Sequence, residues 1–328
     1  MLTIEQSWFY RLGRKRDLAA LLNLSLSELK ALTNDKNFEP WEKTFPDGKK
    51  RLIEEPQPQL KKALTEVQKI LSHIQTPPWL MSGKKKIQPR DNAIAHIKNA
   101  YMISVDIAKF YQNSKREFVY TLFRDDFKQT TDIASLLADL VTYNGHIPTG
   151  APSSQLLAFW TYRKTLEKIH AEASRQHITM TVWVDDITFS SRKPLPKNWL
   201  TFVKRSLDKT DLHLKKEKIK FHGQKDHKIT TGSAISPKGV LKVKNQKRLE
   251  ILSLIKSKKI EQLTLKEARS LLGKLTAQRQ NEPDFFSSTY IRCKKHLRNL
   301  EKMKQKESYH KKPKRIKSLK QKPAAQSR

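Results

Sequence analysis

Three carboxylates interrupt apolar stretches of this chain, and their placement is the first indication of chemistry. Asp106 ends one apolar run, and Asp185 and Asp186 interrupt a second. Burying a carboxylate among apolar residues is costly unless an opposite charge pairs with it. Carboxylate oxygens are also the ligands that Mg²⁺ prefers in proteins. The pattern therefore predicts that Asp106, Asp185 and Asp186 bind metal and form a catalytic set.

Two bound Mg²⁺ ions would support phosphoryl transfer. A pair of ions roughly 3.5–4 Å apart stabilises both the attacking and the leaving oxygen of that reaction. The three carboxylates can converge on such a pair if the two apolar runs are neighbouring strands. An alternative is that Asp185 and Asp186 only form the tip of a hairpin, because the β-type segment Ile187-Thr188-Phe189 follows them directly. The dipeptide by itself leaves both interpretations open.

Periodicity predicts the elements that must position these groups. Residues 101–106 and 178–185 have the residue pattern of β-strands, and the residues between them include helical stretches. Residues 1–37 carry leucines at helical spacing, which predicts a small helical layer; a helix-turn-helix that reads duplex DNA matches the same pattern. Residues 38–58 predict a β-hairpin with a turn at Pro46-Asp47-Gly48. Residues 241–303 predict helices, and residues 304–328 predict a disordered, Lys-rich tail.

The net charge narrows the class of partner. The 328 residues include 66 Lys and Arg against 32 Asp and Glu, a net +34, and phosphate backbones are the commonest polyanions that neutralise such a field. A membrane surface is a weaker candidate, because the chain has no run of about 18 apolar residues and no signal-peptide pattern at its start. We therefore expect a cytoplasmic protein that binds nucleic acid and no membrane.

The single cysteine limits other chemistry. Cys293 cannot form an internal disulfide, and one cysteine excludes a Cys-rich zinc site. We expect it to be a passive thiol in the core. A metal would then be held by oxygen ligands, which again favours Mg²⁺.

The carboxylates and their neighbours resemble a known family. Residues 104–111, Ser-Val-Asp-Ile-Ala-Lys-Phe-Tyr, resemble the first catalytic motif of reverse transcriptases. Residues 147–154, Ile-Pro-Thr-Gly-Ala-Pro-Ser-Ser, are similar to their Pro-Gln-Gly-Ala-Pro-x-Ser motif, and residues 183–186, Trp-Val-Asp-Asp, to their Tyr-x-Asp-Asp box. Residues 47–56 resemble the fingers segment, Lys218 lies where the fourth palm motif has its lysine, and residues 272–275 fit the thumb.

Two further segments point to one branch of this family. Residues 92–96, Asn-Ala-Ile-Ala-His, match the Asn-Ala-x-x-His motif of retron reverse transcriptases, and Thr230-Thr231-Gly232 is similar to their Val-Thr-Gly motif. The resemblance implies a bacterial enzyme with two Mg²⁺ that copies a structured non-coding RNA into single-stranded DNA, primed from a 2′-hydroxyl of that RNA. Its implied partners are this RNA, the RNA–DNA product, deoxynucleoside triphosphates and an effector protein in phage defence. A higher-order complex remains open.

The resemblance also implies roles for individual residues. Metal would be bound by the three carboxylates and by the backbone carbonyl of Ile107. The residues implied to contact the incoming nucleotide are Arg51, Lys50, Tyr111, Thr149, Gly150 and Lys218. Those implied to contact primer or template are Trp183, Ala151 and Ser153, and those implied to contact RNA are Asn92, His96, Thr231 and Gly232. For Asn92 and His96, support of the catalytic strand is the alternative.

Three substitutions depart from the family pattern. Trp183 replaces the usual Tyr, Thr149 the usual Gln and Thr230 the usual Val. The acidic residues are intact, so we expect the chemistry to survive. Thr149 lacks the amide that would touch the incoming nucleotide, and this puts the detail of nucleotide selection in doubt.

The predicted fold is α+β, a right-hand polymerase with fingers and palm around an antiparallel sheet and a helical thumb. The predicted divisions are a helical layer at 1–37, fingers at 38–100, a palm at 101–240 with part of the fingers inserted at about 112–145, a thumb at 241–303 and the tail at 304–328. The predicted function is RNA-directed DNA synthesis as part of a retron. Alternatives are a reverse transcriptase of another class, from a mobile element or another defence system, and a catalytically silent RNA-binding scaffold.

Overall fold

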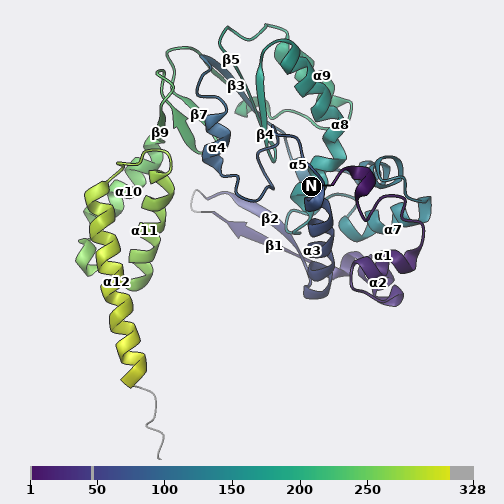
Figure 1. The fold of residues 1–328 in the computed structure, drawn as a ribbon, viewed down its shortest axis with the longest axis horizontal. Coiled ribbons are helices and arrows are strands. Elements are labelled where there is room, and N and C mark those ends of the chain that lie inside the picture. The colour runs from purple at the N-terminus through teal and green to yellow at the C-terminus, as the bar shows by residue number, and fades with distance from the viewer. Residues whose placement is uncertain (1, 46–47, 311–328) are drawn as a thin grey trace, which may run out of the picture. The chain divides into compact units, whose positions relative to one another are not determined.

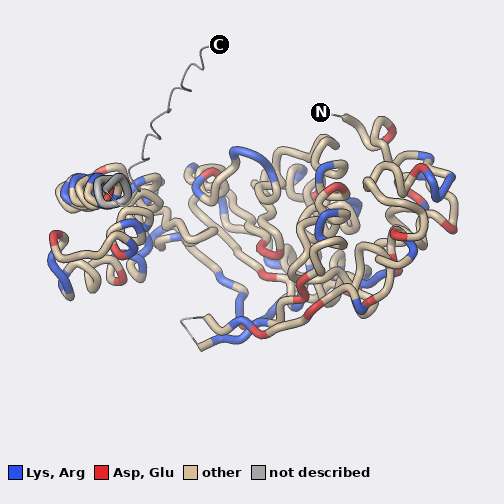
Figure 2. The backbone as a smooth tube through the Cα atoms, turned by 90° about the horizontal axis from the view of Figure 1, so that it is seen from below, with Lys and Arg blue, Asp and Glu red and all other residues tan. Residues whose placement is uncertain are grey.

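The computed structural model describes residues 2–45 and 48–310, with side chains up to residue 305. The chain divides after Leu241 into two compact units (Figure 1). Lys and Arg occur throughout both units, with Asp and Glu interspersed (Figure 2). Among the described residues, no helix combines the length and the apolar character needed to cross a membrane.

The first unit mixes helices and short strands. Its helices are η1 (Ile4–Gln6), α1 (Lys15–Leu21), α2 (Leu26–Leu32), η2 (Asp35–Asn37), α3 (Pro58–His73), α4 (Pro89–Ile94), α5 (Phe110–Asn113), α6 (Arg116–Thr121), η3 (Leu122–Asp126), α7 (Thr131–Val141), α8 (Ser154–Arg175), α9 (Trp199–Asp208) and η4 (Lys216–Lys218). Its strands are β1 (Phe38–Thr44), β2 (Lys50–Pro56), β3 (Tyr101–Asp106), β4 (Thr179–Trp183), β5 (Asp186–Ser191), β6 (Lys220–His222), β7 (Lys228–Thr230) and β8 (Ser233–Ile235). β9 (Leu241–Val243) begins at the division and completes a sheet in the order β7-β8-β9.

An antiparallel sheet in the order β4-β5-β3-β6 carries the predicted carboxylates. Its strands form because apolar residues alternate with small polar ones, and Met102, Val105, Ile187 and Phe189 are all buried. β5, the second arm of the β4–β5 hairpin, is the neighbour of β3. The two apolar runs are thus joined through the hairpin, and β4 itself does not pair with β3. Helix α8 packs against β4 and α9 (Figure 1).

The N-terminal layer forms as its leucine spacing predicts. Ser25 caps α2 by accepting a hydrogen bond from the Glu28 backbone N–H at 3.2 Å, and the Glu28 carboxylate accepts one from the Ser25 N–H at 2.7 Å. This reciprocal pair is a capping box, which satisfies two otherwise unpaired backbone donors. Leu18 and Leu29 are fully buried in the core of the unit.

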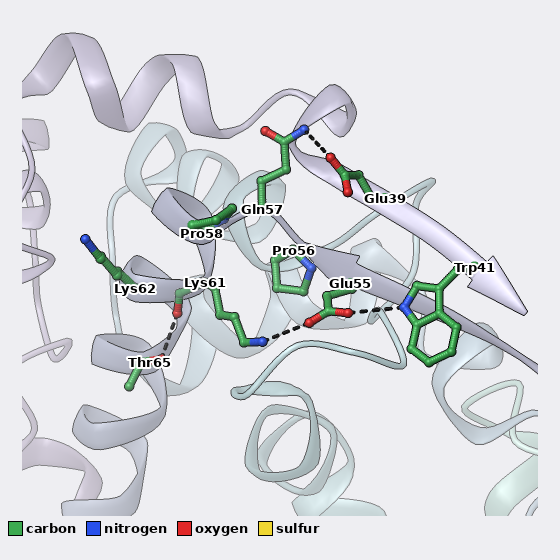
Figure 3. Close-up of a pocket in the computed structure, with 9 residues that line it drawn as sticks. All are labelled: Glu39, Trp41, Glu55, Pro56, Gln57, Pro58, Lys61, Lys62 and Thr65. Carbon is green, nitrogen blue, oxygen red and sulfur yellow. Dashed lines mark hydrogen bonds and ion pairs between the residues drawn. The ribbon is translucent and has the colours of Figure 1, made fainter. Parts of the chain in front are cut away.

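The predicted hairpin of residues 38–58 is also present, with β1 and β2 paired antiparallel. Its turn residues 46–47 lie outside the described part. Next to β2, a hollow of about 420 Å³ is lined by Trp41, Glu55 and Lys61, among others (Figure 3). Glu55 accepts from Trp41 Nε1 at 3.1 Å and from Lys61 Nζ at 2.9 Å. These contacts tie both strands of the hairpin to α3.

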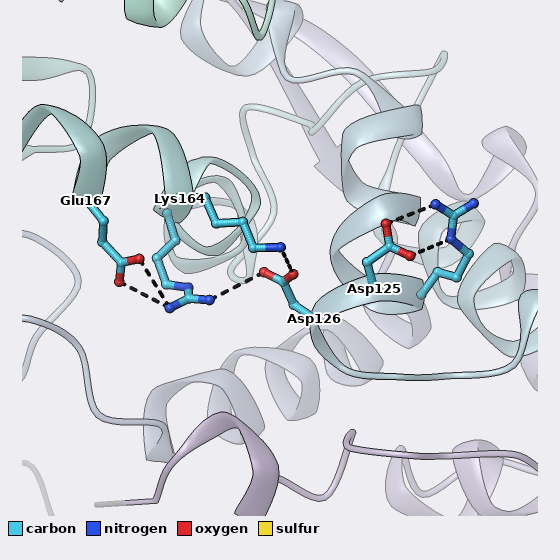
Figure 4. A network of polar contacts seen from close by, with 6 residues as sticks. Asp125, Asp126, Lys164 and Glu167 are labelled. Atoms are coloured by element: carbon cyan, nitrogen blue, oxygen red, sulfur yellow. Dashed lines mark hydrogen bonds and ion pairs between the residues drawn. The ribbon is translucent and has the colours of Figure 1, made fainter.

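A polar network links η3 to α8. Asp126 pairs with Lys164 and, at 3.5 Å, with Arg163, whose guanidinium also contacts Glu167 at 3.1 Å (Figure 4). The Asp126 side chain is 9% exposed. A nearly buried carboxylate requires such compensation, so this network is structural and explains why these charges occur far from the strand ends.

The second unit is helical. It contains α10 (Asn245–Ser257), η5 (Ile260–Gln262), α11 (Leu265–Arg279) and α12 (Ser287–His310). Cys293 is fully buried in its core, as predicted. The prediction that the chain becomes disordered from residue 304 is wrong for residues 304–310, which continue α12 because Lys, Gln and Glu are good helix formers. Residues 311–328 lie outside the described part.

Candidate functional site

Strand register brings the predicted carboxylates to one end of the central sheet. Asp106, the last residue of β3, pairs with Asp186, the first residue of β5. The Ile107 N–H donates to the Asp185 carbonyl at 2.9 Å, which fixes the hairpin tip against β3. Asp106 is buried, Asp185 is half-buried and Asp186 lies at the surface. The hairpin tip is therefore part of a three-carboxylate cluster.

These carboxylates destabilise one another's charges. Burial, followed by the negative charge of Asp106, raises the pKa of Asp185. Although Asp186 keeps solvent exposure as a residue, surrounding protein atoms desolvate its carboxylate. This desolvation, followed by the charges of Asp185 and Asp106, raises the pKa of Asp186 to about 6. A cluster whose charges repel in this way favours a bound cation.

Lys218 is the cation that the structure places in this cluster. Its Nζ lies 2.5 Å from Asp106 Oδ2, and this hydrogen bond raises the pKa of Lys218. In the part of the chain that the structure describes, no three Asp, Glu, His or Cys side chains are arranged to enclose a metal ion. The donor chemistry fits Mg²⁺, because the three carboxylates carry more negative charge than one ammonium neutralises. Metal binding by these residues and by the Ile107 carbonyl stays a prediction.

The turn that carries Asp185 has a strained backbone. Val184 adopts φ = 58°, a left-handed conformation that is unfavourable for a β-branched residue. The Val184 N–H donates to Ser82 Oγ at 2.9 Å, and Ser82 is buried. The segment before Ser82 continues this contact, because the Met81 N–H donates to the Val182 carbonyl at 2.8 Å. Ser82 therefore holds the strained turn in place.

Three of the predicted nucleotide contacts differ in their exposure and in their charged neighbours: Arg51, Lys50 and Tyr111. Arg51 is exposed on β2, and its positive charge lowers the pKa of Asp185 against the larger raising effects. Lys50 pairs with Glu42 at 3.1 Å, so Arg51 is the better placed of the two cations. Burial, followed by the negative charge of Asp185, raises the pKa of Tyr111 to about 12. Arg51 thus acts electrostatically on Asp185, and the charge of Asp185 acts on Tyr111.

The loop of residues 146–150 is clamped to β2, which changes the interpretation of Thr149. Glu54, 2% exposed, accepts hydrogen bonds from the Thr149 N–H at 3.0 Å and from His146 Nε2 at 2.9 Å. This hydrogen bond to Glu54 raises the pKa of His146. The Thr149 hydroxyl donates to the Leu52 carbonyl at 2.9 Å. The Thr149 side chain is therefore engaged with β2 in this structure.

Gly150 is required for this clamp. A Cβ at Gly150 would lie 2.5 Å from the Glu54 carbonyl oxygen and 3.1 Å from the Glu55 Cα. The close approach that the structure contains at Gly150 is to the backbone of β2, and the implied contact of Gly150 with the incoming nucleotide stays a prediction. Ser153 is fully buried, so its predicted contact with primer or template is wrong for this conformation. Ala151 is 9% exposed, which leaves little surface for such a contact, and Trp183 is half-buried at the end of β4.

The two segments assigned to the retron branch meet in space. Asn92 Nδ2 donates to Thr230 Oγ1 at 3.3 Å and to Thr231 Oγ1 at 3.4 Å. Thr231 in turn donates to the Pro89 carbonyl at 2.7 Å, and Thr230 Oγ1 lies 3.0 Å from the Thr188 hydroxyl of β5. This chain of bonds connects α4, β7 and β5. Gly232 is exposed, with φ = 82°.

His96 contacts both strands of the β4–β5 hairpin. Its Nδ1 lies 2.6 Å from Ser190 Oγ in β5, and its Nε2 lies 2.8 Å from Thr181 Oγ1 in β4. His96 and Asn92 are 0% and 1% exposed. Direct contact of these two side chains with RNA is therefore wrong for this conformation, and the alternative, support of the catalytic strands, fits their positions. The predicted RNA contacts of Thr231 and Gly232 remain predictions.

Sequence reasoning did not single out Ser82 or assign a role to Glu54. Glu54 lies beside Glu55 in a strand rich in charge, and nothing in that pattern marks it as the buried one of the two. Ser82 begins a basic segment at residues 82–86. Its role depends on the contact with Val184, which is 102 residues away in the sequence. No pattern of neighbouring residues in the sequence indicates the role of Ser82 or of Glu54.

The burial of His96 predicts how the free energy of unfolding depends on pH. Burial lowers its pKa from 6.5 to about 4, so the unfolded chain binds a proton between these values while the folded chain does not. The free energy of unfolding should therefore fall by about 3 kcal/mol as pH drops from 6.5 to 4.

All six tryptophans lie in the first unit, so tryptophan fluorescence during urea unfolding measures this unit. His96→Gln should remove that part of the pH dependence, and His227→Gln, at an exposed site, should retain it. Identical pH profiles for wild type and His96→Gln would contradict the prediction.

Carboxylates at the end of β3 and at the tip of the β4–β5 hairpin, one of them paired with a lysine, are consistent with the reverse transcriptase motifs. Comparison with known proteins finds similarity to retron reverse transcriptases. The Retron Se72 reverse transcriptase of Salmonella heidelberg (strain 579083-10) is 28% identical over 164 residues, 49% of this chain and 42% of that protein. The Retron Ec86 reverse transcriptase of Escherichia coli is 25% identical over 231 residues, 68% of this chain and 72% of that protein. The Retron Ec48 reverse transcriptase of Escherichia coli is 26% identical over 62% of this chain and 55% of that protein.

These matches confirm the resemblance to retron reverse transcriptases. The matched region spans less than two thirds of the length of the Se72 and Ec48 proteins. No family model matches the chain. Among solved structures, apo telomerase from Candida tropicalis, truncated from its C-terminal domain, matches with a TM-score of 0.45 and 13% identity over 67% of this chain and 61% of that one.

Proposed function

We propose that this protein is an RNA-directed DNA polymerase of a retron. The observation that carries the proposal is the register that sets Asp106 opposite Asp186 at the tip of the β4–β5 hairpin. Sequence similarity to retron reverse transcriptases supports the same activity. The proposed substrates are an RNA template and deoxynucleoside triphosphates. Priming from a 2′-hydroxyl of the template RNA, a nearby effector and a role in phage defence are parts of the same proposal.

The proposed architecture is that of a right-hand polymerase. The β1–β2 hairpin would belong to the fingers, the central sheet to the palm and the helices after β9 to the thumb. Fingers and palm would meet where Glu54 of β2 binds the Thr149 backbone. That contact would hold Arg51, three residues before Glu54, near the carboxylates.

The proposed chemistry divides among the residues of the cluster. Mg²⁺ held by Asp106, Asp185 and Asp186 would activate the primer hydroxyl and neutralise the departing pyrophosphate. Lys218 stays protonated at neutral pH, because its pKa is raised. It could therefore bind a phosphate oxygen or donate a proton after release from Asp106. Arg51 offers a guanidinium fork that fits the triphosphate, and Tyr111 would limit space at the ribose.

Primer extension tests the proposed activity. Purified protein with Mg²⁺, four deoxynucleoside triphosphates, an RNA template and an annealed DNA primer should yield an alkali-stable, DNase-sensitive product. Ribonucleoside triphosphates should be incorporated poorly. Lack of any extension by folded, RNA-binding protein would refute the polymerase and favour a silent RNA-binding scaffold.

The strained turn gives a prediction about catalysis. Ser82→Ala removes the acceptor for the Val184 N–H, and we expect kcat for nucleotide incorporation to fall about tenfold, because a small displacement of a catalytic group is costly. KM for the nucleotide should change little. In a Val184→Gly background the same substitution should cost much less, because glycine adopts positive φ without strain. Ser72→Ala, on the exposed face of α3, is the matched control. An equal loss from Ser82→Ala in both backgrounds would show that relief of this strain is not the cause.

A further inference from the structure

A basic hollow lies at the end of the central sheet opposite the carboxylates. Its volume is about 850 Å³. It is lined by residues 95, 98 and 99 before β3, by residues 176–179 at and before the start of β4, and by residues 191–194 and 196 at and after the end of β5. The register pairs Tyr101 with Ser191 at this end of β3 and Asp106 with Asp186 at the other. At a rise of about 3.3 Å per residue, roughly 17 Å of β3 separates the two ends.

The charges around this hollow have one sign. Its lining includes Lys98, Arg192 and Lys193, together with His177, and contains no Asp or Glu. The three cations are exposed. Within the described residues no carboxylate lies in ion-pair contact with them, whereas Lys115, for example, is paired with Asp211 at 2.7 Å. The hollow thus concentrates positive charge that the protein itself does not neutralise.

Hydrogen bonds connect the floor of the hollow to the β4–β5 hairpin. Asn99 Nδ2 donates to Thr179 Oγ1 at 3.0 Å and to Ser190 Oγ at 2.7 Å. Ser190 also contacts His96, which reaches Thr181 in β4. The segment after β5 is held by a hydrogen bond from Ser191 Oγ to the Lys193 carbonyl. The cations therefore project from fixed segments, which reduces the entropy lost when a ligand binds.

We propose that this hollow binds phosphates of the RNA that the protein copies, on a part of the RNA away from the template segment. This inference rests on the proposed function, because it identifies where that RNA is held. An arginine fork can bind a phosphate in a bidentate way, and lysines add point charges. The volume falls within the range of about 300–1,000 Å³ typical of ligand sites. The distance from Asp106 separates this anchor from the site of nucleotide addition.

The test removes the three charges and compares the result with an equal loss elsewhere. Lys98→Gln, Arg192→Gln and Lys193→Gln are combined in one variant. The control combines Lys30→Gln, Lys36→Gln and Lys128→Gln, at exposed positions outside the hollow, so both variants have the same net charge. Binding of a fluorescein-labelled RNA hairpin with single-stranded flanks is measured by anisotropy at several KCl concentrations.

The hollow variant should bind this RNA about tenfold more weakly at low salt, and its slope of log affinity against log salt should be less steep by about 2. The control should keep the wild-type slope. Primer extension on a short RNA template with a DNA primer should continue in both variants, because neither change touches the carboxylates. Equal losses of RNA affinity in both variants would contradict a specific site, because they would reflect only the overall positive charge of the protein.

Two other outcomes would also overturn the inference. An unchanged affinity in the hollow variant would exclude phosphate binding there. If ATP binds the wild-type chain but not the hollow variant, while RNA affinity is unchanged, the hollow holds a free nucleotide. The proposed function fails separately, through absence of primer extension by the wild-type protein, and this binding assay does not depend on that reaction.

Discussion

Asp185→Asn should abolish DNA synthesis and leave the fold intact. The substitution removes one charge and keeps the shape of the side chain, so we expect incorporation to fall roughly 10³-fold, equivalent to about 4 kcal/mol of transition-state stabilisation. The negative charge of Asp185 contributes to the raised pKa of Asp186. Removing that charge should therefore keep or slightly increase the free energy of unfolding. The measurements are single-nucleotide incorporation, urea unfolding and RNA binding.

The matched control is Asp17→Asn, at a surface ion pair with Arg14, where exposed pairs contribute about 1 kcal/mol or less. It should change neither activity nor RNA binding. Loss of activity in Asp185→Asn together with loss of stability would mean that the substitution damages the fold, and the assignment of Asp185 to catalysis would lose its support. Full activity in Asp185→Asn would contradict the assignment directly.

Gly150→Ala should have the largest structural effect of any single methyl group added near the site. The new Cβ would lie 2.5 Å from the Glu54 carbonyl oxygen and 2.9 Å from its carbon. Both are backbone atoms of β2, so no side chain can rotate away, and overpacking of this kind costs about 1–3 kcal/mol. The loop should separate from β2 and displace Arg51 from the cluster. We expect primer extension to fall about 100-fold, since small displacements of positioning groups have effects of that size.

The control for this variant is Gly13→Ala, whose Cβ would meet only the Thr130 methyl group at 3.9 Å. It should leave stability and activity near wild type. The two interpretations of Gly150 then differ in their results. If Gly150 instead makes room for the incoming nucleotide, the alanine variant will raise KM for that nucleotide with no change in the free energy of unfolding. Such a result would contradict the packing role.

The strand positions and the acidic cluster could be predicted from the sequence because their signals are local. Alternating apolar residues indicate the strands, and Asp106 and Asp185 stand out as carboxylates within them. The motifs then indicated a polymerase site and its branch. The Ser25–Glu28 capping box was equally predictable, since both partners lie within one helical turn.

The partners of individual polar residues could not be predicted, because they come from distant parts of the chain. His96 has a pattern that suited contact with RNA, yet its two partners, Thr181 and Ser190, lie 85 and 94 residues away. A small hydroxyl that accepts one hydrogen bond in the core leaves no sequence signal. Gly150 shows the same limit: its motif implied a contact with the incoming nucleotide, and only the structure identifies β2 as the neighbour.

The nucleic acid that remains bound to the protein after purification tests the retron assignment most directly. The wild-type chain is expressed with its native flanking DNA and purified, and the bound nucleic acid is digested with RNase or DNase in separate samples. We predict a branched species in which DNA is joined to RNA, so that each enzyme shortens it and neither removes it completely. The Asp185→Asn protein should carry the RNA without DNA. Wild-type protein that extends primers but carries no such DNA would contradict the retron assignment.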